Sequence, residues 1–232
     1  MLAKGERADR NDFASRCCCQ SAVFRAMRPP LPIDPDSIKG FLDPDEGWAL
    51  YDQARSLPGT VPCLEIGSYC GKSTVYLGAA CQARDAVLFA VDHHRGSEEH
   101  QPGEAYHDPD LAVADGGGVD TFRTFRDTLA RADLEGSVVP LVAPSAVAAR
   151  AWATPLGLVF IDGGHSMEAA LTDYRCWAPR LMTGGILAIH DIFEDPADGG
   201  RPPFEIWELA KRSGLFEEIA LVKTLGFLRR LG

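Results

Sequence analysis

The sequence contains no long apolar run and is short of basic residues. No stretch of about 18 or more apolar residues occurs, and the first residues lack the continuous apolar core of a signal peptide, so neither membrane insertion nor export is predicted. Only 23 Lys and Arg stand against 33 Asp and Glu, which gives a formal net charge of -10. Because nucleic acids and anionic membranes attract clustered basic residues, this balance argues against both as partners. We therefore expect a cytoplasmic protein with a neutral or weakly charged substrate.

Paired cysteine spacing is also missing. The seven cysteines are an odd number and include the consecutive residues Cys17, Cys18 and Cys19. None shows the paired spacing of a zinc site or of a disulfide framework. Adjacent side chains on one short segment rarely converge on one ion, so a metal site at the triplet is the less favoured alternative. We interpret the cysteines as free thiols.

The remaining composition suits one large domain. With 232 residues, of which 46% are hydrophobic, the chain can bury a single well-formed core. Residues 1–34 mix charges, the cysteine triplet and a proline-rich end, which predicts a flexible leader or flap ahead of a domain at 35–232. Within this domain the polar segment 93–118 is long for a connection, and we expect either a lid over the site or a solvated loop.

Short apolar runs bounded by turn residues alternate with helix-sized segments. Such runs, apolar on both faces, are typical of a doubly wound parallel sheet. Two final runs are separated by only two residues and predict a closing antiparallel hairpin. The sequence therefore predicts an α/β, Rossmann-like, doubly wound sheet of seven strands, mostly parallel with a C-terminal antiparallel hairpin. The expected strands are 63–66, 87–91, 138–142, 158–161, 186–189, 216–222 and 225–231, and the expected helices are 44–55, 73–81, 120–132, 167–177 and 204–212.

The segment 61–74, VPCLEIGSYCGKST, indicates a strand, a tight glycine turn and a helix start. Gly67 and Gly71 let the backbone approach a ligand, and the helix beginning near Lys72 directs its free N–H groups toward it. Either a phosphate or a carboxylate suits such a turn. A phosphate-binding loop needs about four residues before its Gly-Lys pair, whereas only three stand between Gly67 and Gly71. A nucleotide-dependent phosphotransferase therefore remains one alternative.

Two residues at the ends of later strands suit a bound nucleoside. Asp92 follows the second strand, 25 residues beyond Gly67, about where related folds hold the two ribose hydroxyls. Ser145 follows the third strand, where its hydroxyl and backbone N–H can border an adenine. The Asp92 carboxylate is the stronger indication, because it matches two vicinal hydroxyls.

Two carboxylates and two imidazoles follow the next two strands. Asp162 and Asp191 offer hard oxygen ligands for Mg²⁺ at the edge where open α/β sheets bind ligands. His190 is either a further ligand or an outer contact, and an imidazole ligand leaves Mn²⁺ as an alternative ion. His165 is the candidate base that takes a proton from a hydroxyl; the competing interpretation is that it caps the helix after Ser166.

Together these motifs resemble class I S-adenosylmethionine-dependent methyltransferases, in particular the bacterial (actinobacterial) O-methyltransferases of macrolide sugars and of mycobacterial methylmannose and methylglucose polysaccharides. The residues that carry the resemblance are Glu65-Ile-Gly-Ser68, Asp92, Asp162-Gly-Gly-His165, Gly184-Gly185 and His190-Asp191. The resemblance implies methyl transfer to a hydroxyl of a sugar, oligosaccharide or glycosylated small molecule, assisted by Mg²⁺ or Mn²⁺. His190 departs from the family, which usually has a carboxylate or amide there.

The resemblance also implies residue roles. The implied catalytic residues are Asp162, His165 and Asp191, and the implied metal ligands are Asp162, Asp191 and His190. The residues expected to bind S-adenosyl-L-methionine are Glu65, Gly67, Ser68, Tyr69, Gly71, Ser73, Asp92, His93, Ser145 and Asp162. The expected partner is a small-molecule or oligosaccharide acceptor, with a homodimer as a possible assembly, and a non-catalytic cofactor-binding protein is the second alternative.

Overall fold

The computed structural model describes residues 28–97, 100–101, 103, 107–113 and 118–232. The chain divides into two units, Met1–Leu31 and Pro32–Gly232, and the second is described below. Residues 1–27, which include the cysteine triplet, lie outside the described residues, as does much of the segment 93–118. The flexible leader and the lid therefore stay predictions.

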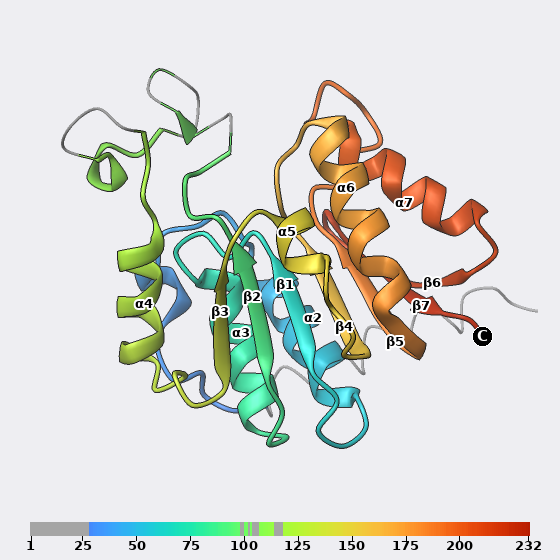
Figure 1. The fold of residues 1–232 in the computed structure, drawn as a ribbon, viewed down its shortest axis with the longest axis horizontal. Coiled ribbons are helices and arrows are strands. Elements are labelled where there is room, and N and C mark those ends of the chain that lie inside the picture. Colours follow the sequence, from blue (N-terminus) through green and yellow to red (C-terminus); the bar gives the residue numbers. More distant parts are fainter. Residues whose placement is uncertain (1–27, 98–99, 102, 104–106, 114–117) are drawn as a thin grey trace, which may run out of the picture. The chain divides into compact units, whose positions relative to one another are not determined.

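A seven-stranded sheet forms the centre of the second unit (Figure 1). The strand order is β3-β2-β1-β4-β5-β7-β6; the first five strands run parallel, and β7 is antiparallel to both of its neighbours. This arrangement confirms the predicted fold class, including the closing hairpin. The strands are β1 (Cys63–Ile66), β2 (Leu88–Asp92), β3 (Val138–Val142), β4 (Leu156–Ile161), β5 (Leu181–Ile189), β6 (Phe216–Val222) and β7 (Leu225–Arg230).

The central strands are buried on both faces because helices cover the sheet on each side. Every residue of β1 and of β4 is buried. β4 and β5 begin earlier than their apolar runs suggest, because their pairing shifts register between Leu156 and Leu158, and glycines interrupt the start of β5. The sequence pattern therefore locates these strands but misplaces their first residues.

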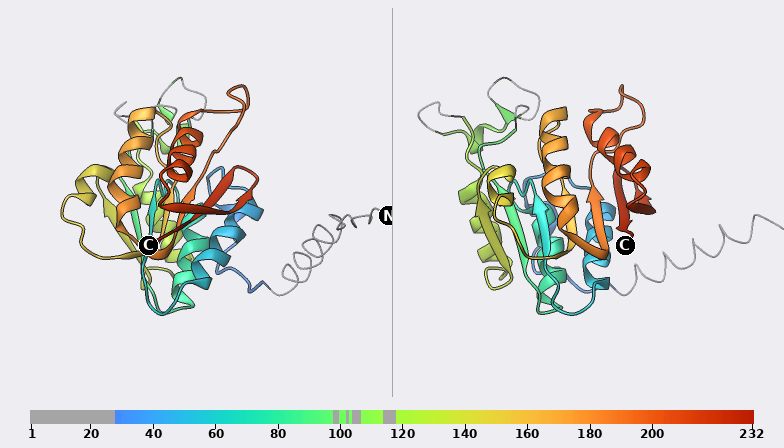
Figure 2. Two further views of the ribbon diagram at one scale, coloured as in Figure 1. Left: turned by 90° about the vertical axis from the view of Figure 1, so that its right-hand side faces the viewer. Right: turned by 45° about the vertical axis from the view of Figure 1, so that its right-hand side comes forward.

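The helices form two layers (Figures 1 and 2). On one face α2 (Pro44–Ser56) packs against α3 (Lys72–Gln82), and α4 (Phe122–Arg131) contacts the turn before α3, where Thr128 Oγ1 donates to Cys70 O at 2.8 Å. The other face carries α5 (Ser145–Ala149), α6 (Met167–Trp177) and α7 (Pro202–Arg212). Short 3-10 turns lie at η1 (Pro35–Ser37), η3 (Pro109–Leu111) and η4 (Ala178–Arg180).

The predicted capping box starts α2. The Asp43 carboxylate accepts from Asp45 N at 2.8 Å, and the Glu46 carboxylate accepts from Asp43 N at 3.3 Å, with Pro44 at the first helical position. These contacts satisfy N–H groups that the helix cannot pair internally. Among the described residues, no helix combines the length and apolar character needed to cross a bilayer.

Candidate active site

A cavity of about 670 Å³ lies where the parallel strands end. Its walls come from the turns that follow β1 to β5, so five separate connections meet there. The volume falls within the range of about 300–1,000 Å³ that is usual for small-molecule sites. Eight of the ten predicted cofactor-binding residues line it: Gly67, Ser68, Tyr69, Ser73, Asp92, His93, Ser145 and Asp162.

The glycine turn after β1 brings two backbones together. A Cβ atom on Gly67 would lie 2.0 Å from the carbonyl oxygen of Asp162, and its φ of +86° is left-handed, so glycine is required there. Gly71, with φ of +95°, precedes α3, and no side chain in the described part of the chain caps this helix. Gly71 therefore shapes the turn without lining the cavity.

Glu65 is the other predicted cofactor residue that does not line the cavity. It is fully buried in β1 and accepts hydrogen bonds from Ser73 Oγ at 2.5 Å and Thr74 Oγ1 at 2.7 Å. Burial raises the pKa of Glu65 to about 8, although the two hydroxyl donors oppose that shift. Its observed contacts tie the strand to the start of α3.

Polar groups for a nucleoside are available at the end of β2 and in the first turn. The Asp92 carboxylate accepts from Tyr69 N at 2.8 Å and from His94 N at 2.7 Å, which fixes its orientation at the cavity wall. The Ser68 side chain also lines the cavity; its Oγ is buried and has no hydrogen-bond partner among the described residues. Since buried polar atoms are normally paired, an unpaired hydroxyl here suits a ligand contact.

Ser145 lies at the cavity wall and is hydrogen-bonded to Asp173, a buried carboxylate that was not predicted from the sequence. Trp177 Nε1 donates to Ser145 Oγ at 2.7 Å. Burial raises the pKa of Asp173 to about 6, and a hydrogen bond with Ser145 opposes the rise. Asp173 lies inside an amphipathic helix, where the sequence pattern gives no sign that it faces a cavity.

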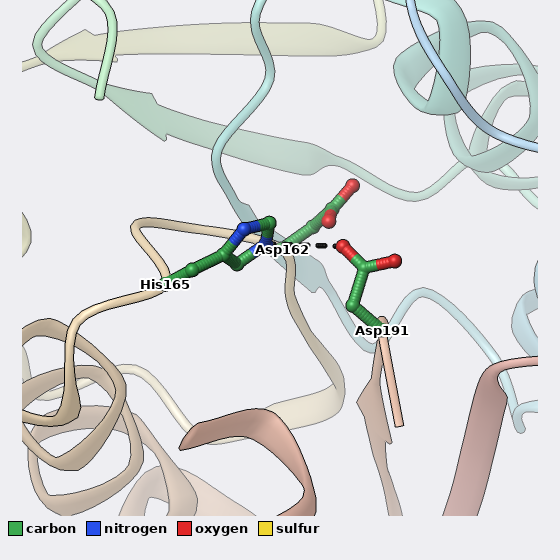
Figure 3. Close-up of side chains that lie close together, drawn as sticks. All are labelled: Asp162, His165 and Asp191. Atoms are coloured by element: carbon green, nitrogen blue, oxygen red, sulfur yellow. Dashed lines mark ion pairs between the residues drawn. The ribbon is translucent and has the colours of Figure 1, made fainter. Parts of the chain in front are cut away.

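Asp162, His165 and Asp191 come together at the ends of β4 and β5 (Figure 3). His165 Nε2 lies 3.0 Å from Asp191 Oδ2, and one ligand atom from each residue falls within 4.8 Å of the other two. Burial by itself would raise the pKa of Asp191, but hydrogen bonds from His165 and His190 hold it well below its usual range. The cluster therefore brings together carboxylate and imidazole groups that could transfer a proton or hold a metal ion.

His165 does not serve as the helix cap that was its competing interpretation. The N-cap of α6 is Ser166, whose Oγ accepts from Ala169 N at 3.2 Å. The imidazole instead lines the cavity beside the two carboxylates.

His190 is enclosed by carboxylates. Its Nδ1 lies 3.1 Å from Asp162 Oδ1 and 3.4 Å from Asp191 Oδ2, while Nε2 lies 3.0 Å from Glu46 Oε2. Burial alone would lower the pKa of His190, yet the surrounding carboxylates raise it strongly. With both nitrogens directed at carboxylates, the geometry favours an outer contact over metal ligation. Glu46 was missed as a site residue because the sequence indicated only its capping role.

A parallel sheet with such a cavity at its strand ends is typical of proteins that bind a nucleoside-containing cofactor. Comparison of this chain with known protein families identifies which of these proteins it resembles. Residues 64–192, more than half of the chain, match the family described as "Methyltransferase domain". The chain belongs to this methyltransferase family.

Several solved structures share the fold at low sequence identity. The O-methyltransferase TomG from Streptomyces achromogenes, in complex with SAM, is 15% identical, with 83% of this chain and 82% of that chain covered and a TM-score of 0.57. The O-methyltransferase from Bacillus cereus, in complex with SAH, is 15% identical, with coverages of 82% and 83% and a TM-score of 0.55. Cofactor-bound Rv0187 from MTB is 15% identical, with coverages of 96% and 90% and a TM-score of 0.62.

Proposed function

We propose that the protein is an S-adenosylmethionine-dependent O-methyltransferase that acts on a hydroxyl of a sugar, oligosaccharide or glycosylated small molecule. The observation that carries the proposal is the pairing of His165 with Asp191 in the same cavity that Gly67 and Asp92 border. The O-methyltransferases TomG and that of Bacillus cereus, solved with SAM and SAH, support the choice of donor and of oxygen as acceptor.

The cavity residues suit that donor. When bound, S-adenosylmethionine supplies an activated methyl group. Asp92 would accept from the ribose hydroxyls with the lone pairs that its two backbone donors leave, and Ser68 would complete its hydrogen bonding on the ligand. The start of α3 would face the carboxylate end of the donor, where helix N–H groups favour negative charge.

His165 would remove the proton from the acceptor hydroxyl as the acceptor oxygen bonds to the methyl carbon and the bond from that carbon to sulfur breaks, which would leave S-adenosylhomocysteine. Asp191, 3.0 Å from the imidazole, stabilises the imidazolium that results. The cavity walls would hold the acceptor oxygen in line with the methyl group, and such alignment accounts for a large part of the rate in transfer reactions.

A divalent ion fits the donor set. The carboxylates of Asp162 and Asp191 lie close enough to share an ion and offer the oxygen ligands that Mg²⁺ or Mn²⁺ takes, while His165 beside them would serve as the base and not as a ligand. An ion held there would lower the pKa of an acceptor hydroxyl. Prolonged EDTA treatment followed by a turnover assay tests whether the reaction needs the ion. Full activity in protein freed of metal would show that it does not.

The proposed acceptor class rests on the resemblance and on the wall of the cavity. Thr172 and Glu168 add polar groups that can bind hydroxyls. Tyr69 and His100 pack with ring centroids 4.9 Å apart and offer an aromatic surface to the apolar face of a sugar ring. The net charge of -10 also suits a neutral acceptor better than an anionic one.

Thermal unfolding with candidate ligands tests the choice of cofactor. S-adenosylhomocysteine should raise the unfolding temperature, and ATP should not, since a ligand that binds only the folded state stabilises it. Ser68→Ala should reduce the shift with S-adenosylhomocysteine while leaving the ligand-free protein as stable as the wild type, because its hydroxyl has no protein partner among the described residues. Stabilisation by ATP alone would instead support the phosphotransferase alternative.

A further inference from the structure

Three residues far apart in the sequence meet behind the catalytic cluster. Glu46 lies in the first turn of α2, His190 follows β5, and Thr224 lies in the turn between β6 and β7. Glu46 is 144 positions from His190 and 178 from Thr224. Only His190 of the three lines the cavity. We call Glu46 and Thr224 the Glu46 bracket.

Each oxygen of the Glu46 carboxylate contacts one of these partners, and Oε2 also accepts from Asp43 N at 3.3 Å. Oε2 lies 3.0 Å from His190 Nε2, and Oε1 accepts from both the backbone N and the Oγ1 of Thr224, at 2.9 and 2.8 Å. The residue is 3% exposed. A buried carboxylate is costly unless it is paired and hydrogen-bonded, and this one meets both conditions.

The bracket holds a strained segment. Asp191 has a φ of +58°, in the left-handed region that non-glycine residues adopt only when their surroundings enforce it. On one side His190 contacts Glu46, and on the other Ile192 N donates to Thr224 O at 2.9 Å. His190, before Asp191, thus contacts Glu46, and Ile192, after it, is hydrogen-bonded to Thr224.

We propose that Glu46 is a positioning residue for the proton transfer: through His190 and Thr224 it holds the Asp191 carboxylate where it can orient His165. The inference rests on the proposed function, because it assigns a part in that reaction. The opposite nitrogen of His190 contacts Asp162 and Asp191, so fixing the ring with Glu46 also fixes both carboxylates. Residues that orient catalytic side chains in this way typically affect activity by about 10- to 100-fold.

Two substitutions test the bracket by different routes. Glu46→Gln has almost the same shape, but one acceptor oxygen cannot serve both His190 Nε2 and the two donors of Thr224. Thr224→Val removes the hydroxyl donor and keeps the branched shape, whereas Thr224→Ser keeps the hydroxyl and should restore activity. We expect kcat to fall by about 10- to 100-fold in Glu46→Gln and by less in Thr224→Val, with S-adenosylhomocysteine affinity within about twofold of the wild type.

A control variant changes a neighbouring side chain and keeps every hydrogen bond of Glu46, including the one from the Asp43 backbone N at 3.3 Å. Asp43→Asn removes the ion pair with Lys223 beside the hairpin turn but keeps a good helix cap, so its kcat should equal that of the wild type. Wild-type kcat in folded Glu46→Gln overturns the inference. If Glu46→Gln does not fold, the Thr224→Val and Thr224→Ser pair decides: equal kcat in both overturns it.

A measurement that does not depend on catalytic turnover can test the role of Glu46 separately from the proposed function. Wild-type protein that transfers no methyl group would refute the function but leave the bracket testable by NMR of the histidine ring N–H groups, assigned with His190→Gln. The His190 Nε2–H signal should shift or broaden in Glu46→Gln and stay in place in Asp43→Asn. An unchanged signal in Glu46→Gln contradicts the bracket.

Discussion

At the scale of single residues, His165 gains its proposed role from its neighbours. It follows β4 by a few residues, and the Asp191 carboxylate at the end of β5 lies 3.0 Å from its ring. Ser166 caps the next helix, so His165 is not needed for that. An imidazole supported by a carboxylate at the edge of a cavity is a common arrangement for general base catalysis.

His165→Ala should lower kcat by on the order of 100-fold or more, since no other group would take the proton as efficiently. Its affinity for S-adenosylhomocysteine, measured by calorimetry, should stay near the wild-type value. Glu217→Ala provides the control, because Glu217 is an exposed residue of β6 that does not line the cavity, and its variant should retain full turnover. Undiminished turnover in His165→Ala would show that another group is the base.

Part of this site could be predicted from the sequence, and the rest could not for identifiable physical reasons. Asp162, His165 and Asp191 could be placed together because neighbouring parallel strands end at one edge of a sheet. Glu46 could not, because its contact with His190 spans 144 positions and depends on how α2 packs against the sheet.

At the scale of elements, the connection from β1 to α3 depends on a buried acid. Glu65 is fully buried and is bonded to the hydroxyls of Ser73 and Thr74 at the helix start. The sequence correctly indicated the strand, the glycine turn and the helix. It could not indicate that Glu65 faces α3 and not the cavity, because a buried strand is apolar on both sides and offers no alternation to read.

Glu65 makes stability depend on pH. Its pKa is raised to about 8 in the folded protein from 4.5. Below pH 4.5 the Glu65 carboxyl is protonated in both the folded and the unfolded protein. Between pH 4.5 and about 8 only the folded protein keeps this proton, so the free energy of unfolding falls by up to about 1.4 kcal/mol for each unit that the pH rises. Above pH 8 the loss is complete. Glu65→Gln should therefore gain stability relative to the wild type between pH 5 and 8, by on the order of 3 kcal/mol.

Urea unfolding at several pH values measures this difference. Glu135→Gln is the matched control, because Glu135 is an exposed acid whose removal should leave the pH profile unchanged. Parallel profiles for the wild type and Glu65→Gln would mean that Glu65 is ionised in the folded protein.

At the scale of the whole molecule, the sheet topology could be predicted from the sequence, but the short helix α5 on one face of the sheet could not. Apolar runs of strand length, spaced by helices and ended by a two-residue hairpin turn, leave few other arrangements. The five-residue α5 was not predicted, because one turn of helix after Pro144 shows too little periodicity. The same topology gathers the ends of five parallel strands at one cavity, which is where the site lies.

The most direct test of the account is transfer of a labelled methyl group from S-adenosylmethionine to a panel of sugars, oligosaccharides and glycosylated small molecules. We expect a labelled methyl ether on a hydroxyl of at least one of them, formed by the wild type and reduced by on the order of 100-fold in His165→Ala. Label found only on nitrogen or carbon of an acceptor, or equal transfer by the His165→Ala variant, would contradict it.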